Sequence, residues 1–369
     1  MSDQKSYTPG THPDLPAPVT EIGVVGWVRH NLFSTWYNIL LTALGLWILY
    51  LVIPPLIHWT ILDADWVGTT RQDCSRQGAC WVYIHVWFRQ LMYGLYPKDQ
   101  IWRINVTYLM LGVGIVLLLI PRFPWKKTVA VFLIFVFPVI AYLLLVGGHF
   151  GLPDIETPKW GGLFLTIVIG VVGIVMSLPI GVVLALGRRS DMPVVKSVCV
   201  AFIELWRGVP LITVLFMSSV MFPLFMPEGV DFNKLVRALV GVMLFAAAYM
   251  AEVIRGGLQA IPKGQYEAAD ALGLSYWKSM GLIILPQAMK LVIPGIVNTF
   301  IGLFKDTTLV LIIGLFDFLG MAQFVGTNPD WLGFAVEGYV FVAFVFFWFC
   351  WGMSLYSQNL EKKLATGYR

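Results

Sequence analysis

Apolar stretches of about twenty residues recur along this chain, and they restrict its fold more than any other feature. A helix of that length spans the hydrocarbon core of a bilayer, where no water can satisfy backbone N–H and C=O groups. Of the 369 residues, 58% are hydrophobic and only 12% are charged, whereas soluble domains carry about 25% charged residues. These values exclude a string of soluble domains and predict an all-α, polytopic integral membrane protein in the lipid bilayer.

We predict eight transmembrane helices. In chain order they cover residues 36–58, 104–120, 128–146, 161–187, 205–225, 235–253, 291–313 and 334–356. The first apolar run begins too late for a cleavable signal peptide. Four prolines between residues 8 and 18 favour a disordered tail there.

The basic residues orient these spans. If the N-terminus is cytoplasmic, 15 of the 25 Lys and Arg residues fall on the cytoplasmic side and 8 on the other side. This excess predicts that both termini are cytoplasmic. The net charge of +4 is too small to indicate nucleic-acid binding.

The chain divides into four predicted parts. They are a disordered cytoplasmic tail (1–35), an N-terminal extension with three spans and a long periplasmic loop (36–155), a transmembrane domain of five spans (156–358) and a second cytoplasmic tail (359–369). A basic loop at 254–290 interrupts the five-span domain on its cytoplasmic side. It is too polar to be a span and too patterned to be a linker.

Two helices are expected in that loop. Pro262 prevents one helix from running through it, so a new helix is predicted over 263–272, stopped by Gly273. A second helix is predicted over 275–285, closing at Pro286. The first would be a rod of about 15 Å outside the membrane, which is only marginally stable alone and requires a partner surface.

The loop resembles the EAA signature of the membrane subunits of ABC importers. The matching residues, at the signature's spacing, are Glu267, Ala268, Ala269, Gly273, Ile283, Leu285 and Pro286. Residues 204–211 (ELWRGVPL) and 305–309 (KDTTL) are similar to segments of the polar amino-acid branch, which includes histidine-, glutamate-, glutamine- and arginine-type permeases. The extension makes the chain most similar to general L-amino-acid permeases of the Aap/Bzt type in Gram-negative bacteria.

This resemblance implies a type I, MetI-like permease subunit in the inner membrane. In the family, the EAA helix lies in a cleft of a separate ATPase, which implies that Glu267 to Asp270, Gly273, Ile283, Leu285 and Pro286 couple the two. The implied partners are two ATPase subunits, a second and related permease forming a heterodimer, and a periplasmic amino-acid-binding protein. The chain has no phosphate-binding loop of the G-x-x-x-x-G-K-[ST] type, so ATP and Mg²⁺ are expected in the ATPase and no cofactor in this chain.

Charged residues in apolar segments are the candidates for a substrate path. Glu204 and Arg207 lie three residues apart and form either a structural ion pair or a substrate contact, of which we favour the pair. Lys305 and Asp306 lie beside the hydroxyls of Thr307 and Thr308. A zwitterionic amino acid needs both a cation and an anion as partners, although Lys305 and Asp306 could instead neutralise each other.

Cys74 and Cys80 lie in the loop predicted to be outside, in an oxidising compartment. They are candidates for a disulfide. With His85 they could also be imagined as metal ligands, but the spacing lacks a C-x2-C pattern, and we predict no metal site.

Other classes of function fit less well. A secondary transporter should show matching broken helices in two halves, whereas the two halves here differ in span number. No H-E-x-x-H or G-x-S-x-G motif supports a membrane-embedded enzyme. An importer of another small polar solute would have the same architecture and stays an alternative.

Overall fold

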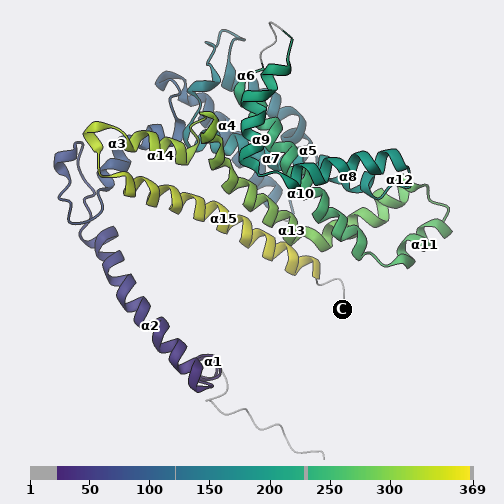
Figure 1. Ribbon diagram of the computed structural model, residues 1–369, viewed down its shortest axis with the longest axis horizontal. Coiled ribbons are helices and arrows are strands. Elements are labelled where there is room, and N and C mark those ends of the chain that lie inside the picture. Colours follow the sequence, from purple (N-terminus) through teal and green to yellow (C-terminus); the bar gives the residue numbers. More distant parts are fainter. Residues whose placement is uncertain (1–22, 121, 228–231, 366–369) are drawn as a thin grey trace, which may run out of the picture. The chain divides into compact units, whose positions relative to one another are not determined.

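The computed structural model describes residues 23–120, 122–227 and 232–365 (Figure 1). Throughout these ranges the chain forms helices and loops, with isolated parallel bridges pairing Asp65 with Cys80 and Gly162 with Asp317. The predicted all-α class is therefore confirmed. The chain divides into two compact units, one ending at Trp81 and the other beginning at Val82.

The first unit contains α1 (Gly23–Leu32) and α2 (Trp36–Ile57), which continues through a π turn to Leu62. Helix α1 occupies residues for which the sequence predicted a disordered tail, and residues 1–22 of that predicted tail lie outside the described part of the chain. After α2, a loop folds back on itself, where Trp81 Nε1 donates to Thr60 O (2.8 Å). A disulfide joins Cys74 to Cys80, whose Cα atoms are 5.6 Å apart.

Seven helices in the described residues are long and apolar enough to span a membrane, or eight if one bent pair is a single span. The seven are α2, α4 (Ile101–Leu119), α5 with α6 (Lys126–Val131 and Phe137–Val146, joined by a π turn), α7 (Gly162–Arg188), α10 (Lys234–Ala260), α13 (Leu285–Asp306) and α15 (Ala335–Ala365). The first four match the predicted spans within a few residues, whereas α10, α13 and α15 depart from them by six to nine residues at one end or both.

The predicted span 205–225 is wrong as a single straight helix. The structure has α8 (Pro193–Gly208) and α9 (Leu211–Phe216), which continues through two further turns to Phe225, at 103° to α8. Pro210 causes the break, because it has no N–H to donate and forces Val209 into an extended conformation (φ −113°, ψ 134°).

The predicted helix end at Pro286 is also wrong. Helix α12 (Tyr276–Ser279) passes through a π turn (Met280–Ile284) directly into α13, which contains Pro286 in its first turn. The Leu285 N–H bonds to Met280 O, five residues back, so the helix is wider just before the proline. The wide turn accommodates a ring that would otherwise clash with the preceding carbonyl.

The centre of the second unit is the pairing of α7 with α10. Gly173 and Gly181 lie on the face of α7 at this contact, and Ser177 between them is buried. A Cβ on Gly181 would lie 2.8 Å from the Met250 side chain. The small residues therefore let the two helices approach closely, as small-residue repeats do in membrane helices.

Within the second unit, α8, α9 and α13 pack against α7 or α10, and α15 packs against α13. Helix α3 (Trp81–Tyr93) and α14 (Phe318–Gly326) are short, and Figure 1 shows α14 beside the start of α15. Much of the predicted N-terminal extension, from Val82 onward, belongs to the same compact unit as the five-span domain. Helix α15 runs to Ala365, so it includes residues 359–365 of the predicted second tail.

Asp317 is a fully buried carboxylate that caps α14. It accepts hydrogen bonds from the N–H groups of Gly320 (2.9 Å) and Leu319 (3.3 Å), while the Phe318 N–H bonds to the Thr166 hydroxyl (3.0 Å). Burial raises the pKa of the Asp317 carboxyl to about 6, because the charged form loses its hydration.

Replacing Asp317 by Asn should reduce the pH dependence of stability. The folded chain binds the Asp317 proton more tightly than the unfolded chain, so this group's stabilisation is complete below about pH 4 and lost as the pH rises through 6. Asn keeps a capping acceptor but does not titrate. Thermal unfolding in detergent should show the parent losing roughly 3 kcal/mol relative to the variant between pH 4 and 7. If parent and variant differed in stability by the same amount at pH 4 and at pH 7, the raised pKa of Asp317 would be contradicted.

Candidate functional site

The basic loop at 254–290 contains the helix α11 (Lys263–Ala271). It ends in a Schellman motif: Gly273 has φ +68°, its N–H bonds to Asp270 O (2.9 Å) and the Leu274 N–H bonds to Ala269 O (3.3 Å). No other part of the described chain lies within 4 Å of a Cβ built on Gly273. The glycine is thus required by the backbone conformation, and the space beside it is open.

One face of α11 is held by its own chain. Ala269 is fully buried, and the Gln265 side chain accepts a hydrogen bond from Gln287 of α13 (3.1 Å). The Tyr266 hydroxyl donates to Leu258 O of α10 and accepts from Arg189, both at 2.9 Å. Ala269 therefore supports the helix from inside, which does not fit its predicted role as a surface contact for a partner.

The opposite face of α11 is exposed. Glu267, Ala268 and Asp270 all lie on it, as the EAA resemblance implies for a contact surface. Beyond the signature, Leu272 is 74% exposed and Trp277 is 73% exposed. Sequence reasoning missed these two side chains, although a Trp and a Leu in a polar loop are a signal for a binding surface.

The other residues predicted to contact an ATPase lie farther along the chain, in the π turn after α12 and the first turn of α13. Ile283 and Leu285 are half-buried within or next to the π turn, and Pro286 is exposed. They shape the connection from α12 to α13 (Figure 1), while α11 lies at the edge of this unit, close to the end of α10. Hence the exposed acidic and apolar side chains of α11 and the segment after it form one group, and the partly buried residues around the π turn form another.

An ionic network replaces the predicted Glu204–Arg207 pair. Glu252 of α10 contacts Arg188 of α7 (2.8 Å), Arg255 (2.8 Å) and Arg207 of α8 (3.7 Å). Glu204 pairs with Arg188 instead of Arg207 (2.8 Å). The prediction was wrong about the partners, because α7 and α10 place opposite charges closer to Glu204 and Arg207 than these two residues of α8 are to each other. Glu252, which the sequence analysis overlooked, is the central residue of this network.

The cluster at Lys305 lies at the end of α13. Lys305 is exposed, Asp306 is half-buried, and the two form no ion pair within 4 Å among the described residues. The hydroxyls of Thr307 and Thr308 donate to the carbonyls of Phe304 (2.8 Å) and Lys305 (2.9 Å). Their role in a substrate path stays a prediction.

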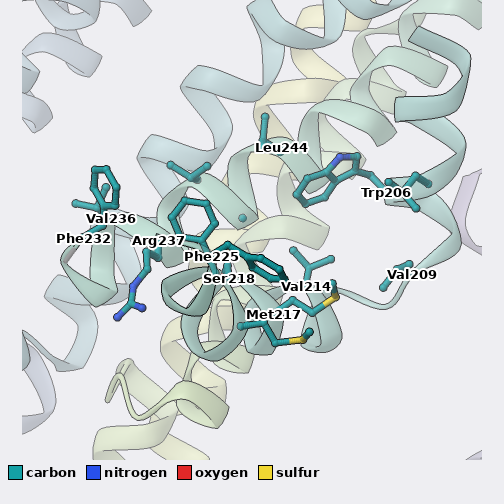
Figure 2. A pocket seen from close by; sticks show the side chains of 15 residues that line it. Trp206, Val209, Val214, Met217, Ser218, Phe225, Phe232, Val236, Arg237 and Leu244 are labelled. Carbon is teal, nitrogen blue, oxygen red and sulfur yellow. The ribbon is translucent and has the colours of Figure 1, made fainter. Parts of the chain in front are cut away.

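A cavity of about 610 Å³ lies between α8, α9 and α10 (Figure 2). Its walls are almost entirely apolar, and its charged member is Arg237, whose guanidinium extends away from the aromatic side chains in Figure 2 and donates to Ser219 O (2.8 Å). Trp206 lies on the cavity wall, but none of the six residues predicted for the substrate path does.

Comparison with known proteins agrees with this architecture. Residues 177–365 match the family described as "Binding-protein-dependent transport system inner membrane component". The chain is 56% identical to the inner membrane amino-acid ABC transporter permease protein YhdY of Escherichia coli, covering 97% of each chain. It is 41% identical to the glutamate/glutamine/aspartate/asparagine transport system permease protein BztC of Rhodobacter capsulatus, covering 96% of each.

One solved structure, an amino acid ABC transporter with histidines, matches at 27% identity and a TM-score of 0.49, covering 55% of this chain and 92% of that chain. The family match spans α10, α11 and α13, and the two relatives span the extension as well. This chain therefore belongs to the family of inner membrane components of binding-protein-dependent transport systems, as a multi-pass permease subunit.

Proposed function

We propose that this permease imports L-amino acids and that α11 receives the motion of a separate, ATP-hydrolysing subunit. The observation that carries the proposal is the exposed face of α11, where Glu267, Ala268 and Asp270 lie outside any membrane span. The names of two relatives that cover nearly the whole chain refer to amino-acid transport, which supports this substrate class.

The same proposal includes the rest of the assembly. A second, related permease completes the path, a periplasmic binding protein delivers the amino acid, and ATP with Mg²⁺ binds to the ATPase. Both termini lie in the cytoplasm of a Gram-negative cell. The excess of basic residues near α11 and at the end of α15 supports this orientation.

The direct test is reconstitution. The chain would be co-expressed with candidate ATPase and permease partners, purified as a complex and placed in vesicles with the binding protein. Uptake of radiolabelled glutamate, glutamine, aspartate, asparagine, histidine and a sugar would then be measured with and without ATP. ATP-dependent uptake of amino acids alone is expected. Uptake driven by an ion gradient without ATP, or ATP-driven uptake of the sugar alone, would contradict the proposal.

The change Glu267→Lys should uncouple ATP hydrolysis from uptake. Reversing a charge on a docking surface places like charges together or leaves the partner's cation unpaired, and we expect uptake per ATP to fall roughly tenfold or more. Glu361→Lys is the matched control, because Glu361 is also an exposed acid, on α15 and distant in sequence from α11. Equal uptake per ATP in the Glu267 variant and the control would be evidence against coupling through α11.

A further inference from the structure

Tyr266 closes a corner where the helical hydrogen-bond ladder is interrupted. Helix α10 ends at Ala260, and α11 begins only after Pro262, which has no N–H to donate. The Tyr266 hydroxyl bridges this break by donating to Leu258 O of α10 (2.9 Å). A side-chain bond therefore holds the angle between two helices that have no continuous backbone ladder between them.

Arg189 holds the same hydroxyl from a third element. It follows the last residue of α7, its Nη1 donates to the Tyr266 hydroxyl (2.9 Å), and its guanidinium carbon lies 5.4 Å from the centre of the Tyr266 ring. Arg189 is exposed while Tyr266 is half-buried. One phenol thus joins α11 to the cytoplasmic ends of both α7 and α10.

The two helices that meet at Tyr266, α7 and α10, are also held to each other directly. Gly181 brings α7 against Met250 of α10, and one residue before Arg189 the side chain of Arg188 pairs with Glu252 of α10 (2.8 Å). A displacement of α11 that reaches this pair is therefore passed to the membrane-spanning core as a unit, since close-packed interiors transmit strain.

We propose that Tyr266 is a positioning residue that fixes α11 to the α7–α10 pair and thereby carries movement of the coupling helix into the membrane. This inference rests on the proposed function, in which an ATPase grips α11. It predicts that a chain without the Tyr266 hydroxyl still binds and stimulates the ATPase, because Glu267 and Asp270 keep their exposed positions. Transport, however, no longer follows each hydrolysis event efficiently.

The test is Tyr266→Phe in the reconstituted complex. The phenylalanine keeps the ring beneath Arg189 but loses both hydrogen bonds, and we expect uptake per ATP to fall about fivefold. ATPase co-purification and the ATP hydrolysis rate should stay within twofold of the parent. Tyr356→Phe is the control, because Tyr356 is an exposed tyrosine on α15, and its uptake per ATP should not change.

A double-mutant cycle separates this role from a purely structural one. If Arg189 acts through the hydroxyl, Arg189→Gln combined with Tyr266→Phe should lower uptake per ATP no further than Tyr266→Phe alone. Unchanged uptake per ATP in Tyr266→Phe, or loss of ATPase binding in it, would overturn the inference. Failure of the proposed function would look different, because uptake by the parent complex would then be independent of ATP and Glu267→Lys would have no effect.

Discussion

Glu252→Gln should destabilise the folded chain by about 3 kcal/mol, the lower part of the range for removing one partner of a buried ion pair. The Glu252 side chain is only 15% exposed and contacts Arg188, Arg207 and Arg255. A neutral amide leaves these three guanidinium groups near one another with Glu204 as their one close carboxylate among the described residues. Thermal unfolding of the purified chain in detergent at neutral pH measures the effect.

Glu204→Gln is the matched control for this network. Its side chain is 54% exposed and contacts Arg188 alone among the charged groups that the structure describes, so its removal should cost less than about 1 kcal/mol. The Glu204 effect should also shrink at high salt, whereas the Glu252 effect should persist, because screening acts mainly on exposed pairs. Similar losses for the two variants would show that the network is not centred on Glu252.

These charges also show which part of the site the sequence could predict. Glu204 and Arg207 were recognisable as an uncommon pair in an apolar segment, and a structural role was the favoured interpretation. Their partners were not predictable, because α7 supplies Arg188, 16 positions from Glu204, and α10 supplies Glu252, 45 positions from Arg207. A helix spacing rule identifies neighbours on one helix but carries no information on what a second helix places beside them.

The fold was predictable where apolar runs are long and uninterrupted, as in α7 and α15. The fold was less predictable where a proline could either end a helix or be accommodated within it. Pro262 ends α10 and Pro210 separates α8 from α9, whereas Pro286 follows a π turn and the helix continues. Pro179 of α7 and Pro294 of α13 are also accommodated inside helices, so hydropathy alone does not report which prolines end a helix.

The sequence predicted the start of α11 correctly and its end within one residue, because local signals agree there. Pro262 precedes it, helix-forming residues fill it, and Gly273 supplies the left-handed conformation that stops it. The division between its two faces could not be read from the same residues. Ala268 and Ala269 are identical in chemistry, yet one is exposed and the other buried, because only tertiary packing decides which side meets the core.

Gly94→Ala should strongly destabilise the second unit, because the residue combines two constraints, a positive φ and a close backbone neighbour. Gly94 has φ +64°, and a Cβ there would overlap the Cα of Gly161, at the start of α7. Gly162, one residue later, donates its N–H to Phe316 O (2.9 Å). Three backbone segments therefore meet at one point, and that contact joins the chain after α3 to the permease core.

The two constraints can be separated with Gly148→Ala. Gly148 also has a positive φ, +74°, but no described atom lies within 4 Å of the Cβ that an alanine would add. The variant should therefore lose only the roughly 1–2 kcal/mol of stability that backbone strain costs. Gly94→Ala should lose about 1–3 kcal/mol more stability than Gly148→Ala, since a backbone neighbour cannot rotate away as a side chain can. Unfolding midpoints in one detergent provide the comparison. If the two variants unfold together, the close approach at Gly161 contributes nothing to stability, and the segment after α3 is only loosely held against the core.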